Sequence, residues 1–217
     1  ELARRYDFIY CSIGIHPDQS AEIAAQHSRE YLDLMAQQLS YEKAMALGEI
    51  GLDYYWNKEN HEVQKKWFVR QMDLAKETGL PIIVHSRDAA KDTLDLVKDC
   101  MKGGMYGGII HCFSYGKEIA GEYLDMGLYL GIGGVVTFKN AKKLKEVVAY
   151  APLEQLVLET DSPYLAPVPY RGKRNNSMYL KEVVKQLAQI KQVSEETVIT
   201  TTLANAKRLY RLEENCG

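Results

Sequence analysis

Four apolar, strand-like segments of the chain each end in a side chain that can bind a divalent metal. These side chains are two carboxylates and two imidazoles, separated by stretches of helical character: Glu49, His85, His111 and Asp161. One polar residue after an apolar strand is ordinary, but four of metal-binding type in the same strand position indicate a common site. We therefore predict a metal centre formed by these four side chains.

The donor types narrow the chemistry of that centre. Imidazole and carboxylate together suit zinc, manganese, iron or magnesium, and no cysteine is placed to add a soft ligand. A carboxylate such as Glu49 can bridge two ions about 3.5–4 Å apart, as two-metal hydrolases require. Paired ions lower the pKa of a bound water, and Asp161 can accept its proton. Glu49 and Asp161 are thus predicted to be catalytic as well as ligands.

A second group of residues can hold a phosphate or touch the substrate. The segment after the last strand concentrates three positive charges: Arg171, Lys173 and Arg174. Arg87 lies two residues past His85 and can add to the same patch, and His16 also ends a strand. Arginine and lysine bind phosphate oxygens directly. A plain solvated loop, and structural packing of His16, remain the alternatives.

The elements that must position these residues alternate between strand and helix. We expect a helix over His61–Thr78, capped by Asn60 and stopped by Gly79. Expected strands cover residues 8–15, 44–52, 81–85, 106–112, 128–136 and 155–160, and further helices 21–39, 89–101, 117–126, 141–150, 177–192 and 194–211. Near-continuous apolar strands between helices indicate a parallel sheet covered on both sides.

Two parallel architectures compete, and the site residues decide between them. A doubly wound open sheet usually shows a Gly-rich phosphate turn after an early strand, and the sequence has none. In a barrel the carboxyl ends of the strands converge on one cavity, whereas an open sheet spreads them in a row. The predicted fold class is therefore α/β, a TIM-type (β/α)8 barrel.

The strand count is low for a closed barrel. About six strands are recognisable, and residues 1–6 read as the tail of a helix already under way. We expect that roughly two βα units, about 50 residues, are missing from the N-terminal side. Residues 1–217 are then a single hydrolase barrel domain that is N-terminally incomplete.

Composition limits the environment and the partners. Apolar residues make up 46% and charged residues 26% of the 217 residues, with a net charge of −2, so polyanion binding requires a local patch. No segment has the length and apolarity of a membrane span, and no signal peptide opens the chain. The four cysteines show no paired spacing, which indicates a reduced, cytoplasmic protein. No obligate protein partner is evident.

Several motifs, in order along essentially the whole chain, resemble the TatD family of metal-dependent deoxyribonucleases. They are Gly14-Ile15-His16-Pro17, Gly48-Glu49-Ile50-Gly51-Leu52-Asp53-Tyr54, Pro81-Ile82-Ile83-Val84-His85-Ser86-Arg87, His111-Cys112-Phe113-Ser114, Glu159-Thr160-Asp161-Ser162-Pro163-Tyr164, Leu165-Ala166-Pro167 leading into Arg171-Gly172-Lys173-Arg174-Asn175, and Asn205-Ala206-Lys207-Arg208-Leu209.

The resemblance implies an amidohydrolase-type barrel with two divalent ions, usually Mg²⁺, with Mn²⁺ or Zn²⁺ as the alternatives. It implies Glu49 as the bridging ligand and Asp161 as a ligand of the first metal and proton acceptor. By the same motifs His85 and His111 are ligands of the second metal, while His16 and Glu159 match positions that line the site. Family members begin with a strand that ends in His-x-His, which this sequence lacks, so we expect weak or no activity from these residues alone.

The resulting functional hypothesis is a deoxyribonuclease of DNA catabolism that hydrolyses phosphodiester bonds with a metal-activated water. Single-stranded ends are the expected substrate, and an exonuclease is favoured because a barrel mouth is a pit that a duplex cannot enter. Two alternatives remain. The same metal site can hydrolyse an amide or ester, such as an aminoacyl-tRNA ester, or the protein is a non-catalytic nucleic-acid-binding barrel.

Overall fold

A computed structural model describes residues 1–217 except 25–27, 57, 105–106 and 213–217. The chain divides into two compact units, Glu1–Ile109 and Ile110–Gly217, and each is described by itself. The prediction of a single domain stays a prediction. Among the described residues, no helix is both long enough and apolar enough to cross a membrane.

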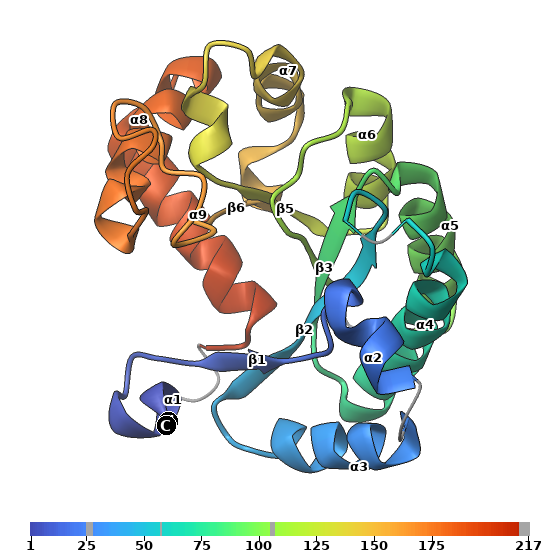
Figure 1. Ribbon diagram of the computed structural model, residues 1–217. Coiled ribbons are helices and arrows are strands. Elements are labelled where there is room, and N and C mark those ends of the chain that lie inside the picture. The colour runs from blue at the N-terminus through green and yellow to red at the C-terminus, as the bar shows by residue number, and fades with distance from the viewer. Residues whose placement is uncertain (25–27, 57, 105–106, 213–217) are drawn as a thin grey trace. The chain divides into compact units, whose positions relative to one another are not determined.

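The first unit is built on parallel strands that follow one another in chain order. They are β1 (Cys11–Ile13), β2 (Ala44–Asp53), β3 (Ile82–Arg87) and β4 (Gly108–Ile110), the last of which ends one residue past the boundary. The helical segments are α1 (Leu2–Arg5), a 3₁₀ turn η1 (Pro17–Gln19), α2 (Ser20–Ala24), α3 (Ser28–Leu39), α4 (His61–Thr78) and α5 (Ala90–Met101). Figure 1 shows α4 and α5 beside strands β2 and β3.

The core of this unit lies between α4 and β2. Trp67, Phe68 and Met72 on one face of α4 are buried, as are Leu47 and Ile50 of β2. That spacing of apolar residues is the helical period the sequence showed. Helix α4 ends because Gly79 adopts a left-handed backbone with φ of 66°.

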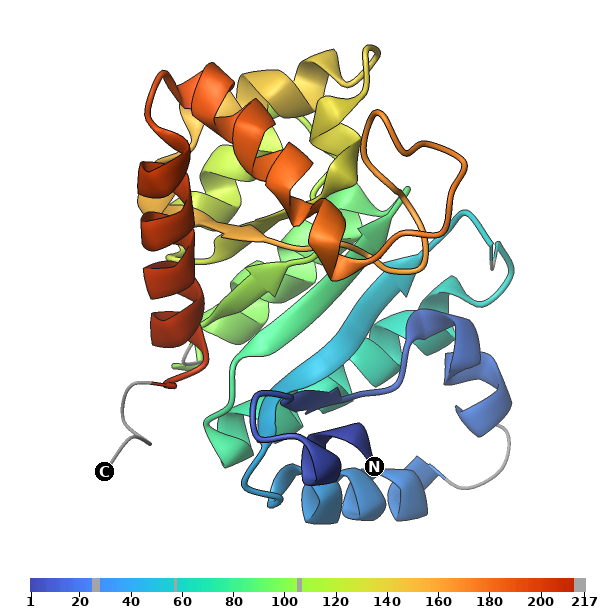
Figure 2. The same ribbon diagram turned by 90° about the vertical axis from the view of Figure 1, so that its left-hand side faces the viewer.

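The second unit alternates strand and helix in the same way. Its strands β5 (Tyr129–Ile132) and β6 (Leu156–Leu158) pair in parallel. The helices are α6 (Lys117–Asp125), α7 (Lys142–Tyr150), α8 (Leu180–Lys191) and α9 (Glu195–Leu209), with 3₁₀ turns η2 (Gly134–Thr137), η3 (Leu153–Gln155) and η4 (Ser177–Tyr179). Figure 2 shows the orange loop that links β6 to α8 and the red helix α9.

Several expected elements differ from the structure in their bounds. The strand expected over residues 8–15 shrinks to Cys11–Ile13, and Phe8 is 79% exposed, so apolarity there does not reflect burial. The helix expected over 21–39 becomes α2 and α3, with residues 25–27 outside the described part. The strand expected over 128–136 ends at Ile132 because Gly134–Thr137 turn into η2. Asn60 occupies the N-cap position of α4, but its side chain makes no capping hydrogen bond.

Gly51 in β2 is a position where the backbone admits no side chain. Its φ is +139°, and a Cβ built there would lie 1.9 Å from the carbonyl oxygen of His85 on β3. Gly127 also has a positive φ, +77°, but no atom lies within 4 Å of its Cβ position. A side chain at Gly127 would therefore add backbone strain alone, whereas a side chain at Gly51 would add both backbone strain and steric overlap.

We expect Gly51→Ala to lower the free energy of unfolding by about 3 kcal/mol or more, because strain and overlap add. Gly127→Ala should cost about 1 kcal/mol, the strain alone. Urea denaturation of both variants measures the difference. Equal losses would contradict the close approach of β2 and β3 at Gly51.

Candidate metal centre

The first unit brings three of the predicted site residues together. His85 Nδ1 lies 2.9 Å from Glu49 Oε1, and His16 Nε2 lies 4.0 Å from the same oxygen. The rings of His16 and His85 are edge to face, with centroids 4.6 Å apart. One ligand atom from each residue falls within 4.8 Å of the others, a spacing that one metal ion can bridge. We call this group the Glu49 cluster.

Asp53 joins the Glu49 cluster, although sequence reasoning did not assign it a site role. Its Oδ2 lies 3.0 Å from His85 Nε2, so the imidazole is held between two carboxylates. The Asp53 side chain is only 1% exposed, and its Oδ1 accepts hydrogen bonds from the backbone N–H groups of Tyr55 and Trp56. Asp53 lies four residues after Glu49 in the same strand, but the register shift at Glu49 interrupts the regular alternation between them, so strand periodicity alone does not identify Asp53.

A β-bulge places Glu49 beside His85. In the pairing of β2 with β3, Gly48 is opposite Ile83 and Ile50 is opposite Val84, so Glu49 is the extra residue. A bulge re-aims the side chain of the residue it contains. Glu49 is also half-buried in a strand whose other residues are buried. It therefore lies within β2 rather than at its end, which corrects the position expected from the sequence.

Two buried glutamines on α4 fix the backbone on either side of the cluster. Gln71 accepts a hydrogen bond from the N–H of Ile15 at 2.7 Å and donates to its carbonyl at 3.1 Å. Gln64 accepts from the N–H of Asp53 at 2.8 Å and donates to its carbonyl at 3.0 Å. The glutamines are seven residues apart, two turns on one helix face. The Gln64 amide thus binds the backbone of Asp53, which belongs to the cluster. The Gln71 amide binds the backbone of Ile15, which directly precedes His16 of the cluster.

The electrostatics of the cluster favour positive charge around His85. Burial alone lowers the pKa of His85, but its hydrogen bonds and charge attraction to Glu49 and Asp53 outweigh burial and raise it. Burial and the neighbouring His85 lower the pKa of His16. Burial opposes ionisation of Asp53, yet the hydrogen bonds from the backbone and His85 lower its pKa overall. The two carboxylates thus create a field that attracts a cation.

The second unit holds the other two predicted ligands. His111 Nε2 lies 3.6 Å from Asp161 Oδ1, and His111 Nδ1 lies 2.7 Å from Glu159 Oε2. Glu159 Oε1 also accepts a hydrogen bond from the backbone N–H of Cys112 at 2.6 Å. We call His111, Cys112, Glu159 and Asp161 the His111 cluster. Glu159, expected only to line the site, is therefore a direct partner of His111.

The Cys112 thiol corrects one expectation from the sequence. A ligand atom of Cys112 falls within 4.8 Å of those of His111 and Glu159, so a soft donor does lie beside this cluster. Cys112 follows β4 with a positive φ of 47° instead of lying inside the strand. Burial raises the pKa of its thiol to about 11, so it is protonated near neutrality. Cys11, Cys100 and Cys112 carry free thiols, and Cys216 lies outside the described residues.

The pKa of His111 is raised more strongly than that of His85. Burial opposes its charged form, but its contacts with Asp161, Cys112 and Glu159 outweigh burial and raise its pKa far above the usual value. Asp161 keeps a third of its side chain exposed, whereas Glu159 keeps 13%. Asp161, the less buried of the two, is thus open to a ligand, and Glu159 holds the imidazole.

The predicted basic loop lies in the second unit and is tied to the segment around Asp161. Asn175 is buried, and its amide donates to the carbonyls of Thr160 and Tyr164 at 2.7 and 2.8 Å. Arg171 stacks 4.2 Å over the ring of Phe138, and Lys173 lies 5.8 Å from the Tyr170 ring centroid. Arg171, Lys173 and Arg174 are all exposed. Their charges are therefore available to an anion near Asp161.

The donor chemistry of both clusters fits divalent metal ions. Each offers imidazole nitrogen and carboxylate oxygen at mutual distances that a metal can span, and each has more acidic than basic groups if its histidines are neutral. A single centre that combines Glu49 with Asp161 stays a prediction. The individual roles that the sequence analysis assigned to the candidate residues also stay predictions.

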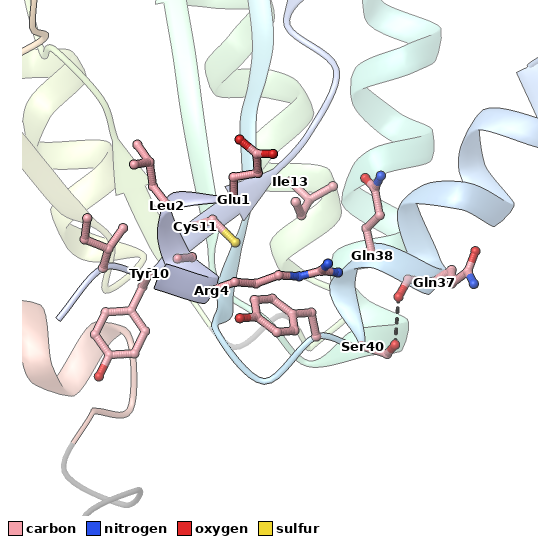
Figure 3. Close-up of a pocket in the computed structure, with 12 residues that line it drawn as sticks. Glu1, Leu2, Arg4, Tyr10, Cys11, Ile13, Gln37, Gln38 and Ser40 are labelled. Atoms are coloured by element: carbon pink, nitrogen blue, oxygen red, sulfur yellow. Dashed lines mark hydrogen bonds between the residues drawn. The ribbon is translucent and has the colours of Figure 1, made fainter. Parts of the chain in front are cut away.

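A cavity of about 890 Å³ lies elsewhere in the first unit. Figure 3 shows its lining from α1, β1 and the end of α3, including Leu2, Arg4, Tyr10, Cys11 and Gln38. None of the candidate site residues lines it. The candidate site residues therefore lie outside this cavity.

Replacing Gln71 tests how much its two hydrogen bonds to Ile15 contribute to the free energy of unfolding. We expect Gln71→Met, which keeps the volume, to lower the free energy of unfolding by about 2 kcal/mol, because two buried backbone groups of Ile15 lose their partners. The exposed Gln37→Met should change it by less than about 0.5 kcal/mol. Urea denaturation compares the two, and equal effects would show that the Gln71 clamp adds no stability.

Comparison with known proteins places this geometry in a family. Residues 1–211 match the family model of the TatD related DNases. The "uncharacterized metal-dependent hydrolase YabD" of Bacillus subtilis is 45% identical over 213 residues, which cover 98% of this chain and 81% of that protein. The corresponding hydrolase YcfH of Escherichia coli K12 is 37% identical and covers 98% of this chain and 78% of its own.

Solved structures agree with this assignment. The crystal structure of YJJV, a TatD homolog from Escherichia coli, has a TM-score of 0.87 at 29% identity and covers 97% of this chain and 80% of its own. A TatD family hydrolase from Entamoeba histolytica, 23% identical, has a TM-score of 0.83, with 96% and 78% covered. These likenesses and the parallel strands confirm the predicted α/β TIM-type barrel class. The chain belongs to the TatD related DNase family and is a metal-dependent hydrolase.

Proposed function

We propose that this protein hydrolyses phosphodiester bonds of DNA, as an exonuclease that acts on single-stranded ends. The observation that carries the proposal is the basic loop held by Asn175 onto Thr160, next to Asp161 of the His111 cluster. An acidic metal cluster repels a phosphate unless cations lie nearby, and exposed arginine and lysine supply them. The description of the family as DNases supports the same substrate.

The residues of the two clusters have distinct tasks in this proposal. Glu49, His85 and His16 would hold one divalent ion. His111 and Asp161 would contribute to another, with Glu159 orienting the His111 ring. Mg²⁺ is the expected metal, and Mn²⁺ or Zn²⁺ are the alternatives. Bound divalent ions supply Lewis acidity towards the phosphate and lower the pKa of a water molecule. Asp161, one-third exposed, accepts the proton of the attacking water on its carboxylate.

The cationic side chains position the DNA. Arg171, Lys173 and Arg174 bind the flanking phosphates, and Arg87 at the end of β3 serves the strand near the Glu49 cluster. These contacts are to the backbone, so the proposed activity does not depend on base sequence. A cytoplasmic location and a role in DNA catabolism belong to the same proposal.

Cleavage of 5′-labelled single-stranded DNA in Mg²⁺ or Mn²⁺ tests the function. From a version extended by an N-terminal His-x-His strand we expect mononucleotide release that EDTA abolishes, and weak or no release from residues 1–217 alone. Glu49→Gln in the extended version should lose at least about 100-fold, because the amide removes the charge shared by both imidazoles. The exposed Glu22→Gln is the matched control and should keep full activity.

The chain of residues 1–217 and the extended version are assayed side by side. Mononucleotides from either form support DNA hydrolysis. No cleavage by either form, with metal bound, would contradict the proposal and favour amide or ester substrates. Covalently closed DNA that is cut as fast as linear DNA would contradict the exonuclease assignment.

The basic loop gives a second prediction, on the salt dependence of DNA binding. Replacing Arg171, Lys173 and Arg174 by alanine should weaken single-stranded DNA binding and reduce the slope of log K against log salt by about two, since each lost phosphate contact removes about 0.7. Lys142→Ala with Lys143→Ala, exposed on α7 of the same unit, is the control. A slope unchanged in the triple variant would exclude the loop from DNA binding.

A further inference from the structure

Two large aromatic side chains and an arginine form an exposed group in the first unit. The rings of Tyr55 and Trp56 are perpendicular, with centroids 4.7 Å apart. The Arg87 guanidinium carbon lies 4.2 Å from the Tyr55 ring centroid and 5.5 Å from that of Trp56. Trp56 is 65% and Tyr55 47% exposed, so much apolar surface faces water. We call Tyr55, Trp56 and Arg87 the aromatic platform.

Hydrogen bonds hold the platform in place from the turn after β2, which carries Tyr55 and Trp56, and from β3, which carries Arg87. The backbone N–H groups of Tyr55 and Trp56 donate to Asp53 Oδ1 at 2.9 and 3.0 Å. Tyr54 N–H donates to the carbonyl of Arg87 at 2.9 Å. A turn whose backbone is fixed at successive residues loses little backbone entropy when a ligand binds, and the contacts of the two rings with each other and with Arg87 limit the freedom of the side chains.

The same Asp53 connects the platform to the candidate metal residues. While Oδ1 binds the turn, Oδ2 binds His85 Nε2 at 3.0 Å, and Arg87 is two residues past His85 in β3. In the pairing of β2 with β3, Arg87 is opposite Asp53. A ligand on the platform is therefore placed beside the Glu49 cluster by one buried carboxylate.

The chemistry of the platform selects its ligand. Aromatic faces stack on nucleobases without sequence preference, and an arginine plane adds stacking and cation–π attraction. The N–H donors of a guanidinium lie in its plane, so stacking leaves them able to bind a phosphate. A base offers its face only when it is unpaired, which excludes an intact duplex. An apolar peptide side chain would gain nothing from the phosphate-binding edge of Arg87.

We propose that the aromatic platform binds an unpaired nucleobase of a single-stranded DNA end beside the Glu49 cluster. This inference rests on the proposed DNA hydrolysis and adds how the strand is held. It assigns Arg87 a combined role in stacking and phosphate binding, and it makes Tyr55 and Trp56 binding residues. Neither aromatic residue has a proposed part in the chemical step.

Fluorescence anisotropy of a labelled oligothymidylate, with EDTA to prevent cleavage, tests the platform. Trp56→Ala should weaken binding about tenfold, the typical effect of losing one base–aromatic stack. Trp56→Phe keeps an aromatic face and should stay within about threefold of the unaltered protein. Tyr31→Ala, an exposed tyrosine on α3, is the control and should bind normally. Because Trp56 is exposed, thermal unfolding of each variant should match that of the parent.

An abasic oligonucleotide of equal length separates stacking from charge. It keeps the phosphates but offers no bases, so the unaltered protein should bind it about tenfold more weakly than oligothymidylate. Trp56→Ala should bind both oligonucleotides with similar affinity. Equal binding of the two by the unaltered protein, or full affinity in Trp56→Ala, would overturn the platform.

A failure of the platform proposal can be distinguished from a failure of the proposed hydrolysis. Metal-dependent cleavage that Glu49→Gln abolishes, together with full affinity in Trp56→Ala, would keep the hydrolase and discard the platform. Base-dependent binding lost in Trp56→Ala, without cleavage in any metal, would keep the platform and discard the phosphodiester reaction.

Discussion

A histidine held between a more buried and a less buried carboxylate is the arrangement on which both candidate metal clusters depend. His85 lies between Asp53, 1% exposed, and Glu49, 34% exposed. His111 lies in the same way between Glu159, 13% exposed, and Asp161, 33% exposed. The more buried member of each pair also accepts hydrogen bonds from the backbone, two N–H groups for Asp53 and one for Glu159, which fixes its position. A carboxylate so fixed orients the ring and raises its basicity as a metal ligand.

This arrangement explains why the two carboxylates beside each histidine differ in their surroundings. A carboxylate removed from water is stable only if hydrogen bonds replace its hydration, and the turn after β2 provides them for Asp53. The less buried carboxylate stays accessible to solvent, so it can bind a metal ion or a proton. The ring nitrogen on the exposed side is Nδ1 in His85 and Nε2 in His111. Both clusters thus place a histidine between two carboxylates, but they use opposite nitrogens of the imidazole ring.

The sequence predicted the types of residue better than their exact positions. The four predicted ligands lie in the two clusters, Glu49 and His85 in one and His111 and Asp161 in the other, although Glu49 and His85 lie within β2 and β3 and not at their ends. Helix His61–Thr78 was predicted to the residue, since a long amphipathic period with a stop glycine leaves little freedom. The family resemblance then supplied the expected metals and substrate class, which composition alone did not contain.

The features that the sequence did not reveal depend on contacts distant along the chain. A bulge in β2 allows Glu49 and Asp53 to share one imidazole, and no local pattern announces a bulge. The exposure of Phe8 is likewise a tertiary property, because apolar residues read as buried in a sequence. Cys112 was assigned to a strand that ends two residues earlier, so its approach to Glu159 was missed.

Helix α4 shows how packing and site geometry are joined. One side of this helix buries Trp67, Phe68 and Met72, which fixes it against the first unit's core. The two buried glutamines on the helix then transmit that rigidity to Ile15 and Asp53 through paired amide hydrogen bonds. Apolar side chains there would leave four backbone groups without partners, at about 1–3 kcal/mol each. A polar residue inside this core is therefore required by the backbone on either side of the metal cluster, and the site's geometry is set by the helix that packs behind it.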